Sequence, residues 1–95
     1  MAGSKVLISE KDFERIMKAL ANRRRLAILR FLKTEKEASV GDIAEEIKLS
    51  FKATSKHLGV LSAAGIVDRE QRNLQMFYHL SSDHPLPARS IISFL

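Results

Sequence analysis

Apolar side chains recur at helical spacing in the first part of the chain. The spacing of Phe13, Met17 and Leu20 predicts a first helix over residues 10–20, capped by Ser9. A second helix is expected after Asn22, with leucines on one side and the polar run 33–37 as the solvated loop that ends it. Serine and asparagine oxygens accept hydrogen bonds from the free N–H groups of a helix start, so both residues favour these boundaries.

Two more helices are predicted with a very short connection between them. Ser39 caps a short helix with apolar residues at helical spacing, and only two residues separate that helix from Ser50, the next cap. The following helix runs from about residue 51 to residue 64 and stops at Gly65, because glycine tolerates the left-handed conformation that ends many helices. Two helices joined in this way predict a helix-turn-helix unit over 39–65.

After Gly65 the apolar period changes from 3.6 residues to 2. Segments 66–70 and 76–80 predict two strands around the polar turn 71–74, which is a β-hairpin wing over 66–80. The tail 84–95 contains two prolines and then apolar residues, and predicts a last short helix over about 88–95. We therefore expect one domain over 1–95, mainly α with a small β-hairpin: a dimeric winged helix-turn-helix in the order α-α-α-α-β-β-α.

Composition adds a charge and removes several kinds of chemistry. The 16 Lys and Arg residues against 11 Asp and Glu give a formal charge of +5, which attracts polyanions such as nucleic acid. There is no cysteine, so disulfides and thiolate metal sites are excluded. The first ten residues hold a three-residue apolar run, too short for a signal peptide, and no stretch approaches the roughly 20 apolar residues of a membrane span. We expect a cytoplasmic protein without a membrane partner.

The fourth predicted helix carries the candidate DNA-binding chemistry. At 100° per residue, Lys52, Ser55 and Lys56 share one face, followed on it only by small groups. Thr54 and Leu58 fall roughly opposite and are expected to pack on the preceding helices. Lysines can donate to guanine O6 and N7 or to phosphate, and a serine hydroxyl can donate or accept. The alternative interpretation is a lysine face that is merely solvated.

The arginines outside this helix have two interpretations each. In the wing, Arg69 and Arg72 either contact DNA phosphate or the minor groove, or pair locally with strand carboxylates. The phosphate contact is favoured more for Arg72 than for Arg69. The run 23–25 places three arginines in the first turn of the second helix, where positive charge opposes the helix dipole. It predicts either a phosphate clamp or salt bridges to acidic residues of the first helix.

The three histidines match no local metal-ligand spacing, so neither a metal site nor a cofactor is predicted. His57 is expected to be a packed or hydrogen-bonded helix residue, and His79 a strand residue. Asp83 and His84 mark the only place where an interface metal could be held. The sequence has no Gly-rich phosphate loop, nucleophile elbow or carboxylate cluster, so we do not expect an enzyme.

A set of short runs between residues 13 and 80 carries a family resemblance. The runs are Leu20-Ala21-Asn22, Arg25-Leu26, Ile28-Leu29, Val40-Gly41-Asp42-Ile43-Ala44, Leu49-Ser50, Ser55-Lys56-His57-Leu58, Val60-Leu61, Ala64-Gly65-Ile66-Val67 and Tyr78-His79-Leu80. Together they resemble the ArsR-like family of winged-helix repressors. The resemblance implies a homodimer joined mainly through the first and last helices, on an operator with two-fold symmetry. By position it implies base reading by Phe51, Lys52, Ser55 and Lys56, and Ser50 beside them completes the predicted set on this helix.

Three features depart from the family pattern. The cysteine pair of many members is replaced by the run 38–41, and no His or Glu follows Asp83 and His84 to complete a metal site. The wing tip lacks the usual glycine, and Asn73 is expected to supply the left-handed residue there. The first two departures argue against metal sensing and leave the inducer unidentified.

The apolar residues are more numerous than one small core needs, which favours a subunit contact. We assign Phe13, Met17, Ile91, Ile92 and Leu95 to it. The expected function is a sequence-specific transcription regulator, a homodimeric repressor that binds a palindromic operator in double-stranded DNA. Two alternatives remain: a winged-helix protein-interaction module without DNA binding, and a module that binds RNA.

Overall fold

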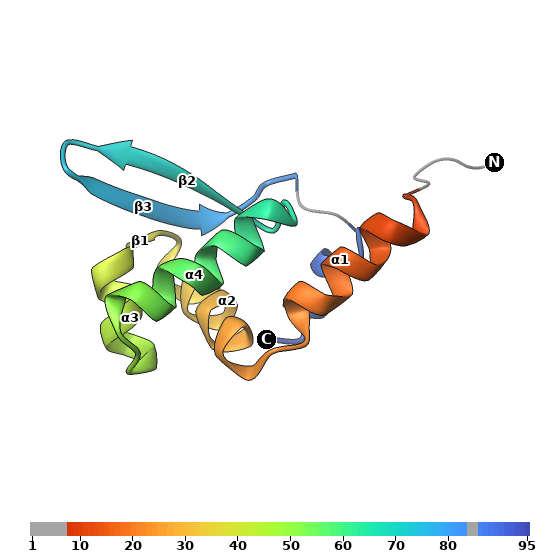
Figure 1. Cartoon of the computed structure of the whole chain (residues 1–95), viewed down its shortest axis with the longest axis horizontal. Coiled ribbons are helices and arrows are strands. Elements are labelled where there is room, and N and C mark those ends of the chain that lie inside the picture. The colour runs from red at the N-terminus through yellow and green to blue at the C-terminus, as the bar shows by residue number, and fades with distance from the viewer. Residues whose placement is uncertain (1–7, 84–85) are drawn as a thin grey trace.

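The computed structural model describes residues 8–83 and 86–95 of the chain. Within these ranges the helices and strands follow the predicted order, with one short strand added (Figure 1). The elements are α1 (Glu10–Leu20), α2 (Arg23–Glu35), β1 (Ala38–Ser39), α3 (Val40–Ile47), α4 (Phe51–Ala63), β2 (Val67–Arg72), β3 (Gln75–Leu80) and α5 (Leu86–Ser93). The predicted winged helix-turn-helix is confirmed.

The predicted caps set the starts of the first four helices. The hydroxyl oxygens of Ser9, Ser39 and Ser50 each accept a hydrogen bond from the backbone N–H three residues on. The carboxamide oxygen of Asn22 accepts two such bonds at the start of α2. Each bond satisfies an N–H group that has no partner inside its helix. Gly65, with φ of +75°, follows α4 as predicted.

The ends of two helices differ from the prediction. α2 continues through Glu35 instead of ending in a loop over 33–37, and Lys36 with φ of +75° follows it. Lysine and glutamate are good helix formers, so a polar composition alone did not mark a loop there. α5 begins at Leu86, earlier than predicted, and the Lys33 ammonium donates to the backbone oxygens of Ile92 and Ser93 at 3.1 and 3.4 Å. α2 thereby holds the end of α5.

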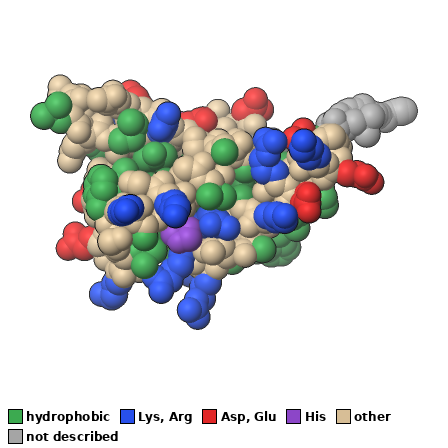
Figure 2. Space-filling view, in the orientation of Figure 1, with side chains coloured by type: hydrophobic (Ala, Val, Ile, Leu, Met, Phe, Trp, Pro, Cys, Tyr) green, Lys and Arg blue, Asp and Glu red, His purple; other side chains and the backbone are tan. Residues whose placement is uncertain are grey.

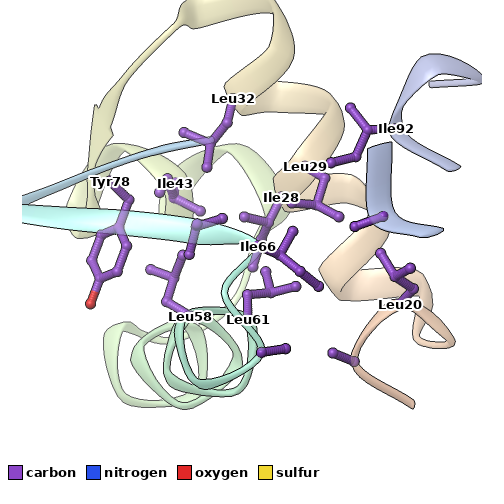
Figure 3. Packing of buried hydrophobic residues seen from close by; sticks show 14 of the residues in the cluster. Leu20, Ile28, Leu29, Leu32, Ile43, Leu58, Leu61, Ile66, Tyr78 and Ile92 are labelled. Atoms are coloured by element: carbon purple, nitrogen blue, oxygen red, sulfur yellow. The ribbon is translucent and has the colours of Figure 1, made fainter. Parts of the chain in front are cut away.

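The core lies where α2, α3 and α4 meet the base of the wing (Figure 3). Its fully buried side chains come from all four elements and include Ile28, Ile43, Leu58 and Ile66. α1 and α5 close one end of this core through Leu20 and Ile92 (Figure 3). Burial of each such aliphatic side chain stabilises the fold by about 1.5–3 kcal/mol relative to exposure. The buried positions of Thr54 and Leu58 on α4, predicted from helical spacing, are therefore confirmed.

The sheet has three antiparallel strands in the order β1-β3-β2. β2 and β3 pair without a break from Val67 opposite Leu80 to Arg72 opposite Gln75. The hairpin turn is therefore two residues long, shorter than the predicted run 71–74, and Asn73 at its tip has φ of +55°. Asparagine adopts this left-handed conformation more readily than most residues, so its predicted role is confirmed. No helix of the described ranges is long and apolar enough to span a bilayer.

Candidate nucleic-acid interface

α4 is packed on the core by one side and presents charge on the other. Thr54, Leu58 and Leu61 are buried, whereas Lys52 and Lys56 are exposed. The cationic side of α4 therefore faces outward, and no carboxylate of the described residues forms an ion pair with either lysine. Figure 2 shows Lys and Arg side chains gathered over α4 and the start of α2, around one histidine.

The remaining residues predicted at the DNA-binding face differ in their exposure and hydrogen bonding. Ser55 is half-buried beside the lysines. The Ser50 hydroxyl accepts the Ala53 N–H at 3.0 Å, so its oxygen serves as the helix cap. Phe51, the first residue of α4, is 63% exposed. The accessible groups of this surface are thus two ammonium groups, a hydroxyl and an aromatic ring.

Arg25 joins three helices through one guanidinium group. Its Nε donates to the backbone oxygen of Ala19 at 2.7 Å, and Nη2 donates to that of Lys18 at 3.1 Å. These carbonyls lie at the end of α1, where backbone oxygens lack helical partners. Nη1 lies 3.1 Å from His57 Nδ1, on α4. Arg25 therefore fits neither the phosphate clamp nor the salt bridges that the sequence predicted.

Two acidic residues of α1 have other partners. Asp12 lies 3.8 Å from Arg15 and Glu14 lies 3.5 Å from Lys18, both within α1. The predicted salt bridges from the 23–25 run to these two carboxylates are absent from the described part of the chain. Residues three or four apart on one helix are close neighbours, which explains the local pairing. Arg23 and Arg24 are exposed, and their phosphate contact stays a prediction.

His57 is a hydrogen-bonded helix residue, as predicted. Because a guanidinium has only donors, Nδ1 of the ring must accept, and the proton of the neutral ring then lies on Nε2. Burial, and then the charges of Arg25 and Arg24, lower the pKa of His57 from its ordinary value. Both effects disfavour the protonated ring, and the contact with Arg25 is made by the neutral form.

Arg72 of the wing is engaged in local contacts. Its two terminal nitrogens donate to the two carboxylate oxygens of Glu37 at 2.8 and 2.6 Å, and Nη2 also lies 3.3 Å from Glu70. The guanidinium carbon lies 4.6 Å from the centre of the Phe77 ring. The hydrogen bond from Arg72 lowers the pKa of the Glu37 carboxyl. The structure thus shows the local pairing that the sequence treated as the lesser alternative for this arginine.

Arg69 points to the other face of the hairpin. It lies opposite Tyr78 in the strand register, and directly paired residues share a face. Tyr78 is buried beside Leu58 of α4 (Figure 3), so this face of the wing turns toward α4. Arg69 is exposed and forms no ion pair with the described residues. Arg69 is therefore the freer of the two wing arginines among the described residues, and the DNA contact of either one stays a prediction.

An apolar groove separates α1 from α5, on another part of the surface. It measures about 470 Å³ and is lined by apolar side chains that include Ile8, Phe13, Met17, Leu86 and Ile91. Phe13 is 47% and Met17 39% exposed, and Ile91 and Leu95 are half-buried. Four of the five predicted interface residues are thus accessible to a partner.

The fifth, Ile92, is a correction. It is only 5% exposed and belongs to the protomer's own core. The sequence shows that the end of the chain is rich in apolar residues. It does not show which of them lie on the inward side of α5 and which on its outward side. For metals, the described residues contain no group of three or more possible ligands. His84, half of the predicted candidate pair, lies outside the described residues.

A helix-turn-helix whose second helix presents cations, followed by a β-hairpin, defines a winged helix-turn-helix protein. A family model described as a helix-turn-helix domain matches residues 20–70. The chain belongs to this family, and its resemblance to ArsR-like regulators is confirmed. The homodimeric winged helix-turn-helix DNA-binding domain of a Mycobacterium bovis protein, named as a possible ArsR-family transcriptional regulator, is 26% identical. It superposes with a TM-score of 0.76 over 99% of this chain and 85% of that one.

Two other relatives are named as an activator and a repressor, respectively. The transcriptional activator HlyU of Vibrio cholerae is 42% identical over 67 residues, which are 70% of this chain and 61% of HlyU. A solved HlyU structure gives a TM-score of 0.75 over 88% of this chain and 87% of that one. The biofilm growth-associated repressor of Agrobacterium fabrum is 37% identical over 72% of this chain and 57% of its own length. The chain thus spans less than two thirds of the length of these two curated relatives.

Proposed function

We propose that this chain is a transcription regulator without catalytic activity that binds double-stranded DNA sequence-specifically and acts in the cytoplasm as a homodimeric repressor. The observation that carries the proposal is the outward face of α4, where Lys52 and Lys56 are exposed and form no ion pair with any residue of 8–83 or 86–95. The start of a recognition helix is the part that reaches base edges in the major groove, and lysine ammonium groups can donate to guanine or phosphate there.

One further observation supports a dimer on a symmetric site. The apolar groove between α1 and α5 is the kind of exposed patch that marks a protein contact. A two-fold contact through it would present two α4 helices, and an operator read by such a dimer has two half-sites about 34 Å apart. The proposed operator is therefore a palindrome.

The test begins with selection of bound sequences from a random duplex pool. Affinity for the selected duplex is then measured by fluorescence anisotropy at about 50 and 200 mM salt, where phosphate contacts predict a steep loss. The Lys52→Ala/Lys56→Ala variant is expected to bind at least about 100-fold more weakly, since each good base contact is worth about 1–3 kcal/mol. Lys11→Ala/Lys36→Ala is the control, because it removes the same charge outside α4.

Three results would contradict the proposal. An unchanged affinity of the α4 double variant would remove these lysines from the interface. A preference for structured RNA over duplex DNA in direct competition would favour the RNA-binding alternative. Failure to bind any duplex would favour a protein-interaction module, in which the apolar groove holds a larger partner.

A further inference from the structure

Phe51 is an exposed aromatic residue at the start of α4, beside the polar residues proposed to contact DNA. It is the first residue of the recognition helix and 63% of its surface is exposed, so it contributes little to the core. At 100° per residue its side chain lies about 40° from Ser55 and about 100° from Lys52. The ring therefore lies at the edge of the polar strip, at the end of the helix that reaches deepest into a groove.

In the major groove, a phenylalanine ring can distinguish base pairs by apolar contact. It has no hydrogen-bond donor or acceptor, whereas the major-groove edges of adenine, guanine and cytosine present donors and acceptors. Thymine also presents a C5-methyl group, which is the apolar feature of the major groove. We propose that Phe51 reads the C5-methyl of a thymine in each half-site, while the lysines of the same face contact guanine or phosphate.

The position of Phe51 argues against a role in the subunit contact. α1 approaches the later part of α4, where Val60 lies in one cavity with side chains of α1. Phe51 is nine residues earlier, which places it about 14 Å away along the helix axis. The apolar groove proposed for dimerisation is lined by α1, α5 and residues flanking them. The aromatic ring thus belongs to the surface with the lysines, and the inference rests on the proposed function of that surface.

The test uses a base that differs from thymine by one methyl group. In the duplex selected by the wild-type protein, each thymine is replaced in turn by deoxyuridine and the affinity is measured. At one position per half-site, the affinity of the wild type is expected to fall about fourfold, because that is the effect of no longer burying one methyl group. For the Phe51→Ala variant, the same replacement is expected to leave the affinity unchanged. For Phe51→Leu, part of the wild-type loss of affinity is expected to remain.

The control variant is Leu74→Ala, which removes an apolar side chain that is 97% exposed at the wing tip. It should keep the full thymine-to-uracil effect. The inference is overturned if Phe51→Ala retains the wild-type loss at every position. A structural role for the ring would give this result, because it would weaken the thymine and uracil duplexes by the same factor. The inference is also overturned if the wild type loses no affinity at any thymine position. Absence of any duplex binding by the wild type would instead contradict the proposed function, so the two failures are distinguishable.

Discussion

One side-chain contact, between Arg25 of α2 and His57 of α4, helps to hold α4 against its neighbours. Arg25 donates to two carbonyls at the end of α1 and to the ring of His57 on α4. A guanidinium has five donors in a rigid fork, so it can serve both helices without moving. The contact with α4 exists only while His57 is neutral, since a protonated ring has no acceptor.

This contact makes stability depend on pH. The pKa of His57 is below its ordinary value of 6.5 in the folded chain, mainly through burial. The unfolded chain therefore binds this proton at a higher pH than the folded chain does. The contribution of the neutral ring is fully present above about pH 6.5 and is lost as the pH falls through the lower pKa of the folded state.

We expect the free energy of unfolding, measured by urea denaturation, to decrease between pH 7 and pH 5. His57→Gln should make that decrease smaller, because glutamine can accept from Arg25 but does not titrate. An NMR titration of the ring gives an independent measurement. A pKa at or above 6.5 for His57, or an identical pH profile in the glutamine variant, would contradict this account.

At the scale of the element, the two wing arginines follow from the two-residue period of the strand. Arg69 and Arg72 are three residues apart, so they lie on opposite faces of the hairpin. Arg72 is held by Glu37, in the segment before β1, and Arg69 shares a face with Tyr78. Only the face with Arg69 is turned toward α4, which presents the lysines.

We therefore expect Arg69→Gln to weaken duplex binding more than Arg72→Gln does. A lost phosphate contact should weaken binding about equally across sequences and reduce the slope of log affinity against log salt by about 1 per contact. Anisotropy titrations of both variants over a salt series measure this. A larger loss of affinity for Arg72→Gln would mean that the pair with Glu37 opens on DNA. Arg72 would then make the phosphate contact that the sequence alone favoured.

Local signals explain how much of the structure the sequence predicted. Serine and asparagine caps with helical spacing located the first four helix starts, because both act within one turn of the chain. Strand β1 was missed because two residues are too short to reveal a period. The partner of Arg72 lies 35 residues away and the partner of Arg25 32 residues away, so neither contact has a local signal. Ile92 was misplaced for a related reason, since spacing shows which residues of a helix are apolar but not which of them the rest of the fold covers.

At the scale of the whole molecule, the surface formed by Lys52 and Lys56 (the lysine surface) and the apolar groove are built on different elements. α4 carries the exposed lysines, while α1 and α5 carry the groove. A dimer formed through the groove would therefore leave Lys52 and Lys56 of both copies free. In each copy, Arg25 would connect the dimer contact to the lysines, because it joins α1 to α4. In the proposed dimer, this separation would allow two copies to bind one duplex at the same time.

The last prediction tests that arrangement with one charge. Met17 lines the groove and is 39% exposed, so Met17→Glu should leave the protomer folded by circular dichroism while placing a carboxylate in the apolar contact. Desolvating an unpaired carboxylate is costly, so light scattering should show a dimer mass for the wild type and a monomer mass for the variant. Leu74→Glu makes the same change on the wing tip and should remain a dimer.

Loss of the dimer should also change how the protein binds DNA. The monomeric variant is expected to bind the full palindrome and an isolated half-site with similar affinity, because only a dimer gains from a second half-site held close to the first. A folded Met17→Glu protein that keeps the dimer mass would show that the groove is not the subunit contact. If it became monomeric yet still preferred the palindrome, the two recognition helices would have to be joined by something other than α1 and α5.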